Sequence, residues 1–449
     1  MSNFYPNLGE LVTVKGTGRP DLFPGVPIVT GASVGLNSSN YVGTDHKMFS
    51  PRLGIAYRPL GNSKLILRGG YGLYYTSIPW VWGSYQLTRN APFTAELNFT
   101  PVSGLTPSLT FADPFPTGSG SNGAAVNPSA NALPMHYRYP AMHQWNLTVE
   151  SQVSNNTSFR ISYLGSESEH MTQQFNINDP YPQAIPEGKS YQDLRPYQPF
   201  SYIDYWSNGL TSNTQQLQVS ARRHFASGLQ FEGEFSWTRM LDNGSYPAGP
   251  WVSDNRNLRY DRGPDPYVRP LNLVGNYTYE LPVGKGKQFL GSAGRALDLL
   301  LGGWQTSGIL TIANGLPYSL NFDPTLPGWQ SGYATNMRPD KVGNPAVSNP
   351  TRAQWFNPAA YAPSAPYTFG NSAPNSLSGP HYFNWDMGAF KTFPITERFK
   401  LTFRSDLMNV LNHPNFNNPH NNISQPDAGQ ITWISGPPRV VQFALRLAF

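Results

Sequence analysis

The 449-residue sequence contains no cysteine, so it has neither a disulfide framework nor a thiolate metal site. It has no run of about twenty uninterrupted apolar residues, which excludes an ordinary transmembrane helix. Charged residues make up only 13% of the chain, and no basic block occurs of the kind that follows a nucleic-acid backbone. The N-terminal stretch MSNFYPNLGELVTVKG lacks the basic and apolar regions of a secretory signal peptide. We therefore expect no nucleic-acid partner and no helical membrane anchor.

Aromatic residues and period-2 patterns are abundant instead. Aromatics reach 14%, and the closing run RVVQFALRLAF alternates apolar residues with polar or small ones. Side chains of a strand alternate between its two faces, so each such run predicts a strand with one apolar face. About eleven runs of this kind can be read, at residues 50–59, 64–75, 143–153, 157–165, 214–224, 229–239, 271–281, 304–315, 382–393, 398–412 and 439–449. The apolar face must meet either a second sheet or lipid.

The connections between these runs alternate in length. Tight turns are predicted at residues 60–63, 394–397, and near Asn155 and Phe225, together with one longer link, 282–303, whose GRALDLLLGG suggests a short helix. Long loops rich in proline, glycine and aromatics fill residues 77–142, 166–213, 240–270, 314–381 and 413–438. A compact soluble domain rarely contains one such loop, whereas outer-membrane barrels combine short periplasmic turns with long extracellular loops.

The predicted fold is therefore all-β: an antiparallel up-and-down transmembrane β-barrel over residues 49–449, preceded by an irregular segment, 1–48. Eleven is an odd number, whereas single-chain bacterial barrels close with even numbers of strands. Short turns and long extracellular loops alternate along the chain, and this alternation places the start of the first strand on the extracellular side. With the missing signal peptide, these features predict an incomplete barrel, the C-terminal half of a longer protein.

Three segments resemble one family. MFSPRLGIAYRPLGNSKLILRGGYGLYY (48–75), NWDMGAFKTFPITERFKLTFRSDLMNVLNHPNFNNP (384–419) and the closing run are similar to hairpins and the last strand of Oar-like TonB-dependent outer-membrane receptors. The resemblance implies a barrel of about 22 strands in its complete form and energised import of a ligand through TonB. It also implies a terminal Phe449 that the barrel-assembly machinery recognises. The plug domain and TonB box of the family are expected upstream of this chain.

No catalytic constellation emerges, so we predict no enzyme, no cofactor and no metal site. RGGYG lacks the dinucleotide fingerprint, and glycine within a barrel strand is better explained by bending or close packing. His413 and His420 have no carboxylates nearby in the sequence. Asp261 and Asp265 are too few for a calcium loop, which needs regularly spaced oxygen ligands.

Two sets of residues are candidates for function. The long loops carry aromatics beside many amides, a combination that suits an oligosaccharide or a peptide but also suits packing of the loops on one another. These ligand candidates are Trp80, Trp82, Tyr85, Trp206, Trp251, Trp329 and Trp355. The proposed assembly signal comprises Phe443, Leu445, Leu447 and Phe449. Lumen-facing charges such as Glu150 and Arg160 either contact a plug or form ion pairs between adjacent strands.

The sequence thus predicts the barrel part of a TonB-dependent receptor in the outer membrane, for an unknown ligand. Its expected partners are outer-membrane lipid, the barrel-assembly machinery and, through a missing N-terminal region, TonB. One alternative is an adhesion or structural barrel without transport. A second is a secreted, soluble β protein that binds carbohydrate.

Overall fold

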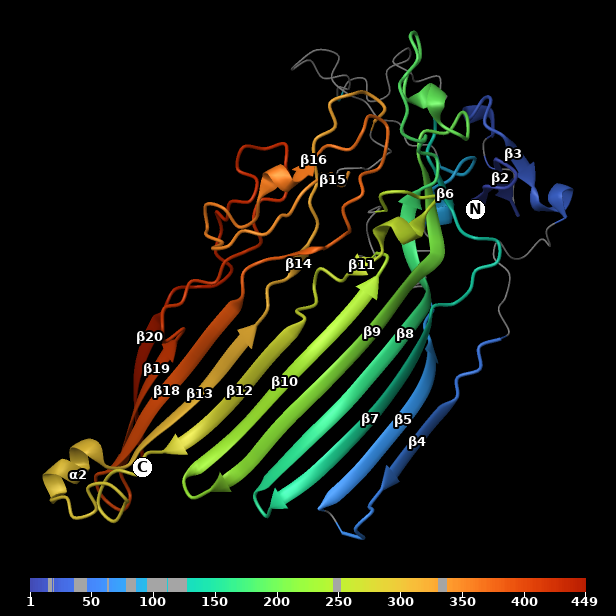
Figure 1. Ribbon diagram of the computed structural model, residues 1–449. Coiled ribbons are helices and arrows are strands. Elements are labelled where there is room, and N and C mark those ends of the chain that lie inside the picture. Colours follow the sequence, from blue (N-terminus) through green and yellow to red (C-terminus); the bar gives the residue numbers. More distant parts are fainter. Residues whose placement is uncertain are drawn as a thin grey trace.

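The structure is a computed structural model that describes residues 1–14, 18, 20–35, 47–62, 64–77, 86–94, 111, 127–244, 252–329 and 337–449. Eleven long strands form one curved antiparallel sheet, and their order in space is their order along the chain (Figure 1). The strands are β4 (Arg52–Tyr57), β5 (Leu65–Tyr75), β7 (Ala141–Ser154), β8 (Thr157–Asn176), β9 (Ile203–Ala226), β10 (Leu229–Asp242), β12 (Leu271–Glu280), β13 (Trp304–Ala313), β18 (Tyr382–Pro394), β19 (Lys400–Met408) and β20 (Val440–Ala448). All eleven predicted runs are strands, which confirms the all-β fold. Within the described residues the barrel is not closed, because β4 and β20 are the two edges of the sheet.

One face of the sheet is apolar and exposed. The strand registers align the predicted apolar positions of neighbouring strands with one another. One row crosses nine strands through Tyr57, Leu67, Val149, Ile161, Val219, Phe235, Leu273, Ile312 and Phe383. We call this exposed apolar face the belt. Apolar side chains that remain exposed over a continuous face match the lipid-facing surface of a membrane barrel.

The opposite face, which we call the luminal face, carries the polar residues. Glu150 lies 3.2 Å from Arg68 and 3.6 Å from Arg160, which belong to the two neighbouring strands. The predicted ion pairs between adjacent strands are present here. In RGGYG the close-packing explanation holds, because a Cβ on Gly72 would lie 2.7 Å from the ring of Tyr74.

The two ends of the sheet differ in their connections. At one end short turns join β4 to β5, β7 to β8, β9 to β10 and β18 to β19, and we call this the short-turn end (Figure 1). The fifth link there, between β12 and β13, contains the predicted helix, α2 (Arg295–Leu301). The other end, the loop end, carries the long connections. Among the described residues, no helix has the length and apolar character to cross a membrane.

Both predicted bounds of the loop at residues 166–213 are wrong. β8 and β9 are 20 and 24 residues long and remain paired as far as Asn176 and Asp204, so the connection covers only residues 177–202. The register shifts between Ser168 and Gln173. A strand needs about 9–11 residues to cross the bilayer, so these two strands project well beyond it. Their projecting part does not face lipid on one side, and it therefore lacks the alternating pattern that reveals the rest.

A small compact unit sits on this projecting hairpin, and we call it the cap. It comprises the sheet of β1 (Ser2–Tyr5), β2 (Glu10–Thr13) and β3 (Ile28–Thr30), with β6 (Ala130–Ala132) and the 177–202 connection. β6 pairs with the start of β9 and lies next to β1. Its core residues are Phe4, Leu11, Phe23, Ala91, Ala130, Ala132, Phe200 and Ile203. Regular structure in residues 1–35 was not anticipated, because strands of three or four residues are too short to show a period.

The remaining elements are short and lie mainly in the loops. They are η1 (Pro20–Leu22), η2 (Gly31–Val34), η3 (Gln192–Leu194), η4 (Leu258–Asp261), β11 (Gly263–Pro264), β14 (Pro317–Tyr318), β15 (Asp340–Lys341), η5 (Pro358–Ala360), β16 (Tyr361–Ala362) and β17 (Leu377–Ser378). β14 pairs with β17 and β15 with β16, so two small ladders brace the long connection between β13 and β18.

Candidate ligand-binding site

A cavity of about 430 Å³ lies among the connections at the loop end. We call it the loop cavity. Its lining residues include Gln173, Asp242, Gly244, Ser253, Asp261, Pro266, Tyr267, Ser319, Leu320, Asn321, Arg338, Pro374, Asn375 and Asn421. They come from the projecting part of β8, the end of β10 and three different long connections. Most of them carry amides, hydroxyls or carboxylates, so the cavity offers hydrogen bonds as well as apolar contact.

An ion pair holds two of these connections together. Arg338 is only 5% exposed, and its Nη1 lies 2.6 Å from Oδ1 of Asp261. The guanidinium also donates to the carbonyl oxygens of Tyr260 and Ser372 and lies 3.7 Å from the centre of the Tyr260 ring. Because each charge is compensated within the protein, the pair fixes the wall of the cavity instead of giving it a net charge.

The carboxylate of Asp261 is further occupied by Ser253, whose backbone N–H and hydroxyl both donate to it. Nearby, burial raises the pKa of the Tyr260 phenol, and the adjacent Arg338 opposes that rise. The carboxylate of Asp261 is thus engaged within the protein and stabilises the wall of the cavity. The expectation that His420 lacks a nearby carboxylate is wrong, because its Nδ1 lies 3.2 Å from Oδ2 of Asp427. Among the described residues, however, no group of three or more His, Cys, Asp and Glu side chains is arranged to hold a metal ion.

The side chain of Gln173 is the chemically unusual feature of the cavity. It is completely buried, yet within the described part of the chain neither Oε1 nor Nε2 has a hydrogen-bond partner. Leaving a buried amide unpaired costs about 1–3 kcal/mol, so native proteins rarely retain one without a reason. Gln173 borders the loop cavity, so a ligand that reached this amide would have to offer it both a donor and an acceptor.

A second cavity, of about 380 Å³, adjoins the first. It is lined by Ser236, Tyr267, Arg269, Asn272, Thr311, Ala313 and Tyr382. Ser236, Asn272, Ala313 and Tyr382 form one row across four strands, next to a row of the belt and therefore on the luminal face. Tyr267 lines both cavities and is 67% exposed. The two cavities share Tyr267, and the second one lies on the luminal face.

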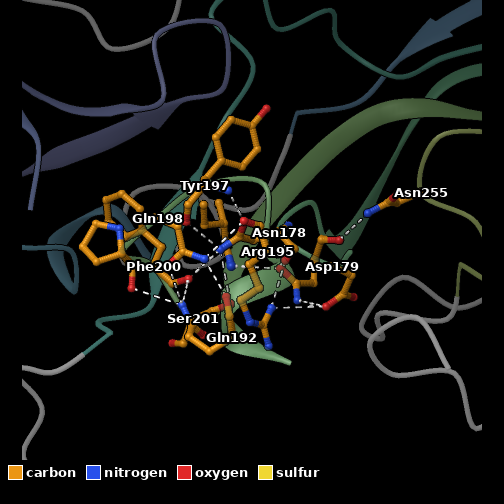
Figure 2. Close-up of polar contacts among 12 residues, drawn as sticks. Asn178, Asp179, Gln192, Arg195, Tyr197, Gln198, Phe200, Ser201 and Asn255 are labelled. Atoms are coloured by element: carbon orange, nitrogen blue, oxygen red, sulfur yellow. Dashed lines mark hydrogen bonds and ion pairs between the residues drawn. The ribbon is translucent and has the colours of Figure 1, made fainter. Parts of the chain in front are cut away.

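A polar network fixes the connection between β8 and β9 beside the cap. In Figure 2 the amide of Asn178 lies at its centre: Nδ2 donates to the carbonyls of Tyr197, Phe200 and Ser201, and Oδ1 accepts from the N–H of Tyr197. The amide therefore replaces the backbone ladder that an irregular segment lacks.

Asp179 lies next to this amide and faces Arg195 at 3.4 Å (Figure 2). Burial raises the pKa of the Asp179 carboxyl to about 6, although Arg195 and Arg256 act in the opposite direction. The network holds the connection in place and has the character of a structural brace, not of a binding site.

The aromatic candidates lie apart from the loop cavity where they can be placed. Trp206 is buried with Leu87 and Leu133, and Trp329 is buried with Phe322 and Met337. Trp355 is half-buried and donates its indole N–H to the carbonyl of Ser378. Trp80, Trp82, Tyr85 and Trp251 lie outside the described residues. The role of all seven in binding stays a prediction.

The predicted assembly residues share one face. Phe443, Leu445, Leu447 and Phe449 alternate along β20 and its end, on the belt side, and each is more than half exposed. Gln173 and Arg338 were missed as site residues, because nothing in their local sequence distinguishes them from the polar residues around them.

The family model of an outer membrane beta barrel domain matches residues 1–442, so the chain belongs to this family. It is accordingly an outer-membrane protein in contact with lipid, and the prediction that it is not an enzyme is confirmed. The family and the exposed belt decide against a secreted, soluble protein. No significant match was found among curated proteins.

Solved structures of outer-membrane transporters and receptors are similar in shape. The outer membrane transporter YddB from Escherichia coli is 12% identical, with a TM-score of 0.48 over 89% of this chain and 40% of that one. BauA, the ferric preacinetobactin receptor from Acinetobacter baumannii, is 10% identical, with a TM-score of 0.40 over 89% and 36%. The pyoverdine receptor FpvA from Pseudomonas aeruginosa gives the same values. The chain thus spans less than half the length of these proteins.

Proposed function

We propose that this chain is the C-terminal part of the barrel of an Oar-like, TonB-dependent receptor that takes up a ligand across the outer membrane. The family assignment and the three family-like segments of the sequence support this proposal. So does the open sheet, because β4 and β20 each have only one neighbouring strand among the described residues. Lipid cannot satisfy the backbone groups of a sheet edge, so further strands must complete the barrel. A plug and the TonB-binding segment would belong to the region that supplies them.

The ligand would bind first in the loop cavity, and the observation that carries this step is the buried, unpartnered amide of Gln173. Arg338 and Asp261 compensate each other, and Asp242 adds a second carboxylate to the lining, so the lining favours a ligand without negative charge that is rich in hydroxyl or amide groups. A neutral oligosaccharide or a peptide fits this description. The aromatic residues predicted from the sequence, Trp355 among them, are proposed as additional contacts on the loops.

The test replaces Gln173 by leucine, which keeps the bulk and removes the amide. Binding of a panel of neutral oligosaccharides and uncharged peptides to the complete receptor is then measured by isothermal titration calorimetry. Loss of two hydrogen bonds should weaken the binding of a true ligand at least about tenfold. The matched control is Gln354→Leu, which changes an exposed glutamine that is not among the lining residues. Equal affinity of Gln173→Leu and the wild type would refute the role of the cavity.

Transport differs from adhesion in the step after binding. In cells that express the complete receptor, dissipation of the proton gradient or deletion of TonB should abolish accumulation of a radiolabelled ligand but leave surface binding intact. Surface binding without any energy-dependent accumulation would favour the adhesion alternative.

The barrel-assembly machinery would recognise the apolar side chains of the last strand. Phe449 is 82% exposed, so it contributes little to packing within the sheet. Replacing it with aspartate should reduce the amount of heat-modifiable barrel in the outer membrane, as judged by gel mobility. Wild-type amounts of folded barrel would contradict a role in recognition.

A further inference from the structure

The link between β12 and β13 exposes an unusual amount of apolar surface. It contains α2, in which Leu297, Leu299, Leu300 and Leu301 are 42%, 53%, 68% and 48% exposed. Phe289 and Leu290, just before the helix, are 56% and 43% exposed. Soluble proteins seldom leave so many large apolar side chains uncovered in one short segment. Something apolar must therefore cover this surface.

Two side chains of the belt hold the end of α2. Nζ of Lys391 donates to the carbonyl oxygens of Asp298 and Leu299, at 3.2 and 2.6 Å. Nε1 of Trp304 donates to the carbonyl of Leu300 at 2.9 Å. The last carbonyls of a helix have no partner within the helix and carry partial negative charge, so a lysine and an indole N–H suit them well.

These two side chains also identify the side of the sheet on which α2 lies. Lys391 is opposite Trp304 on one neighbouring strand and opposite Phe403 on the other. The Phe403 ring is stacked with that of Phe443, which is 68% exposed on the belt. The end of α2 is thus attached to the lipid-facing side of the sheet, at the short-turn end.

The charges of the link complement a phospholipid surface. Lys285, Lys287 and Arg295 are exposed, although Lys287 also lies 3.5 Å from Glu280 at the end of β12. The single aspartate of the link, Asp298, accepts a hydrogen bond from the backbone N–H of Lys285. Exposed leucines beside basic residues are the combination by which a helix lies in a membrane interface, with its apolar side at the acyl boundary and its cations at the phosphates.

We propose that the β12–β13 link is an interfacial membrane anchor: α2 lies in the headgroup layer at the short-turn end and inserts its leucines beside the belt. The occupant of the exposed surface is lipid and not a protein, because the surface continues the belt, which already faces lipid. The anchor would fix the depth and tilt of this side of the barrel, in the way that interfacial residues do in other membrane proteins.

The absence of cysteine from the chain allows a direct test. A nitroxide is attached to Leu300→Cys in the complete protein, reconstituted in vesicles of phosphatidylethanolamine and phosphatidylglycerol. Its accessibility to oxygen, which concentrates in lipid, is compared with its accessibility to a water-soluble nickel complex. Leu445→Cys on the belt is the lipid reference, and Asn155→Cys in the turn between β7 and β8 is the water reference at the same end.

We expect the label at position 300 to resemble that at position 445, with more access to oxygen than to nickel. Replacing Lys391 with methionine should shift it toward the value of position 155, because the helix end loses its attachment. A label at position 300 that is as accessible to nickel as the one at position 155 overturns the proposal. If it is accessible in vesicles but protected in native outer membranes, a protein covers the surface instead, and the proposal is equally wrong.

Discussion

In the membrane-spanning sheet the large apolar side chains are among the most exposed, whereas in the cap they are the most buried. Ile55 and Leu445 of the belt are each 69% exposed. Phe4 and Phe200 of the cap have no exposed surface, and their rings make an edge-to-face contact with centroids 5.1 Å apart. One chain therefore uses the same residue types in opposite ways in two adjacent regions.

The difference arises from the surrounding solvent. The cap lies in water, so burying its apolar side chains is the main source of its stability. The belt lies in lipid, where apolar side chains gain nothing by leaving the surface, and the spanning sheet depends on its complete backbone ladder instead. The two regions should therefore respond to different substitutions, and three experiments test how far they are independent.

The largest effect is expected for Phe200→Ala. Truncating a fully buried phenylalanine costs about 3–5 kcal/mol, and here the loss should fall on the cap. Hydrogen exchange of residues 1–14 and 197–205 should accelerate strongly, while the heat-modifiable mobility of the barrel stays unchanged. If the barrel loses its resistance to heat as well, the cap and the sheet form one cooperative unit.

A smaller effect, confined to the sheet, is expected for Val219→Arg. Val219 lies in the belt row, and an arginine near the bilayer midplane costs about 2–4 kcal/mol. The adjacent Gln218 faces the polar lumen, so Gln218→Arg should cost only about 0.5 kcal/mol. Unfolding of the complete protein in lipid vesicles by guanidinium measures both values. Equal costs would show that the belt does not face lipid.

The smallest effect concerns the brace beside the cap. The pKa of Asp179 is about 6 in the folded protein and 3.8 in its reference state, so its charged form is disfavoured by folding. The free-energy cost of the buried, charged carboxylate is present above pH 6 and is relieved as the pH falls toward 4. Residues 177–202 should therefore be more stable at pH 5 than at pH 7.5, by about 1 kcal/mol. Hydrogen exchange at the two pH values measures the difference.

The matched variant is Asp179→Asn, which retains a hydrogen-bond acceptor for Arg195 and cannot ionise. The protection of its amides, corrected for the intrinsic pH dependence of exchange, should lose most of this difference between the two pH values. If wild type and variant change equally between pH 7.5 and pH 5, another group is responsible.

The same contrast explains how much the sequence could predict. All eleven spanning strands were predictable, because lipid on one side and a polar lumen on the other impose a period of two on residues such as Phe231 and Phe235. Three regions were not predictable: the projecting parts of β8 and β9, the sheet of the cap and the loop cavity. In these regions burial depends on partners that are distant in the chain. Arg338 and Asp261, for example, are 77 residues apart, and no local pattern connects them.

The strict agreement between strand order in space and in sequence has a consequence for the history of the fold. Each strand of the main sheet contacts the strands that precede and follow it, so a pair of strands with its turn is a self-contained module. Duplication or loss of such a pair would alter the circumference while the pairing of the remaining strands of the sheet stays the same. Barrels of different bore can thus arise from one ancestral hairpin, while the loops of each copy diverge to recognise new molecules.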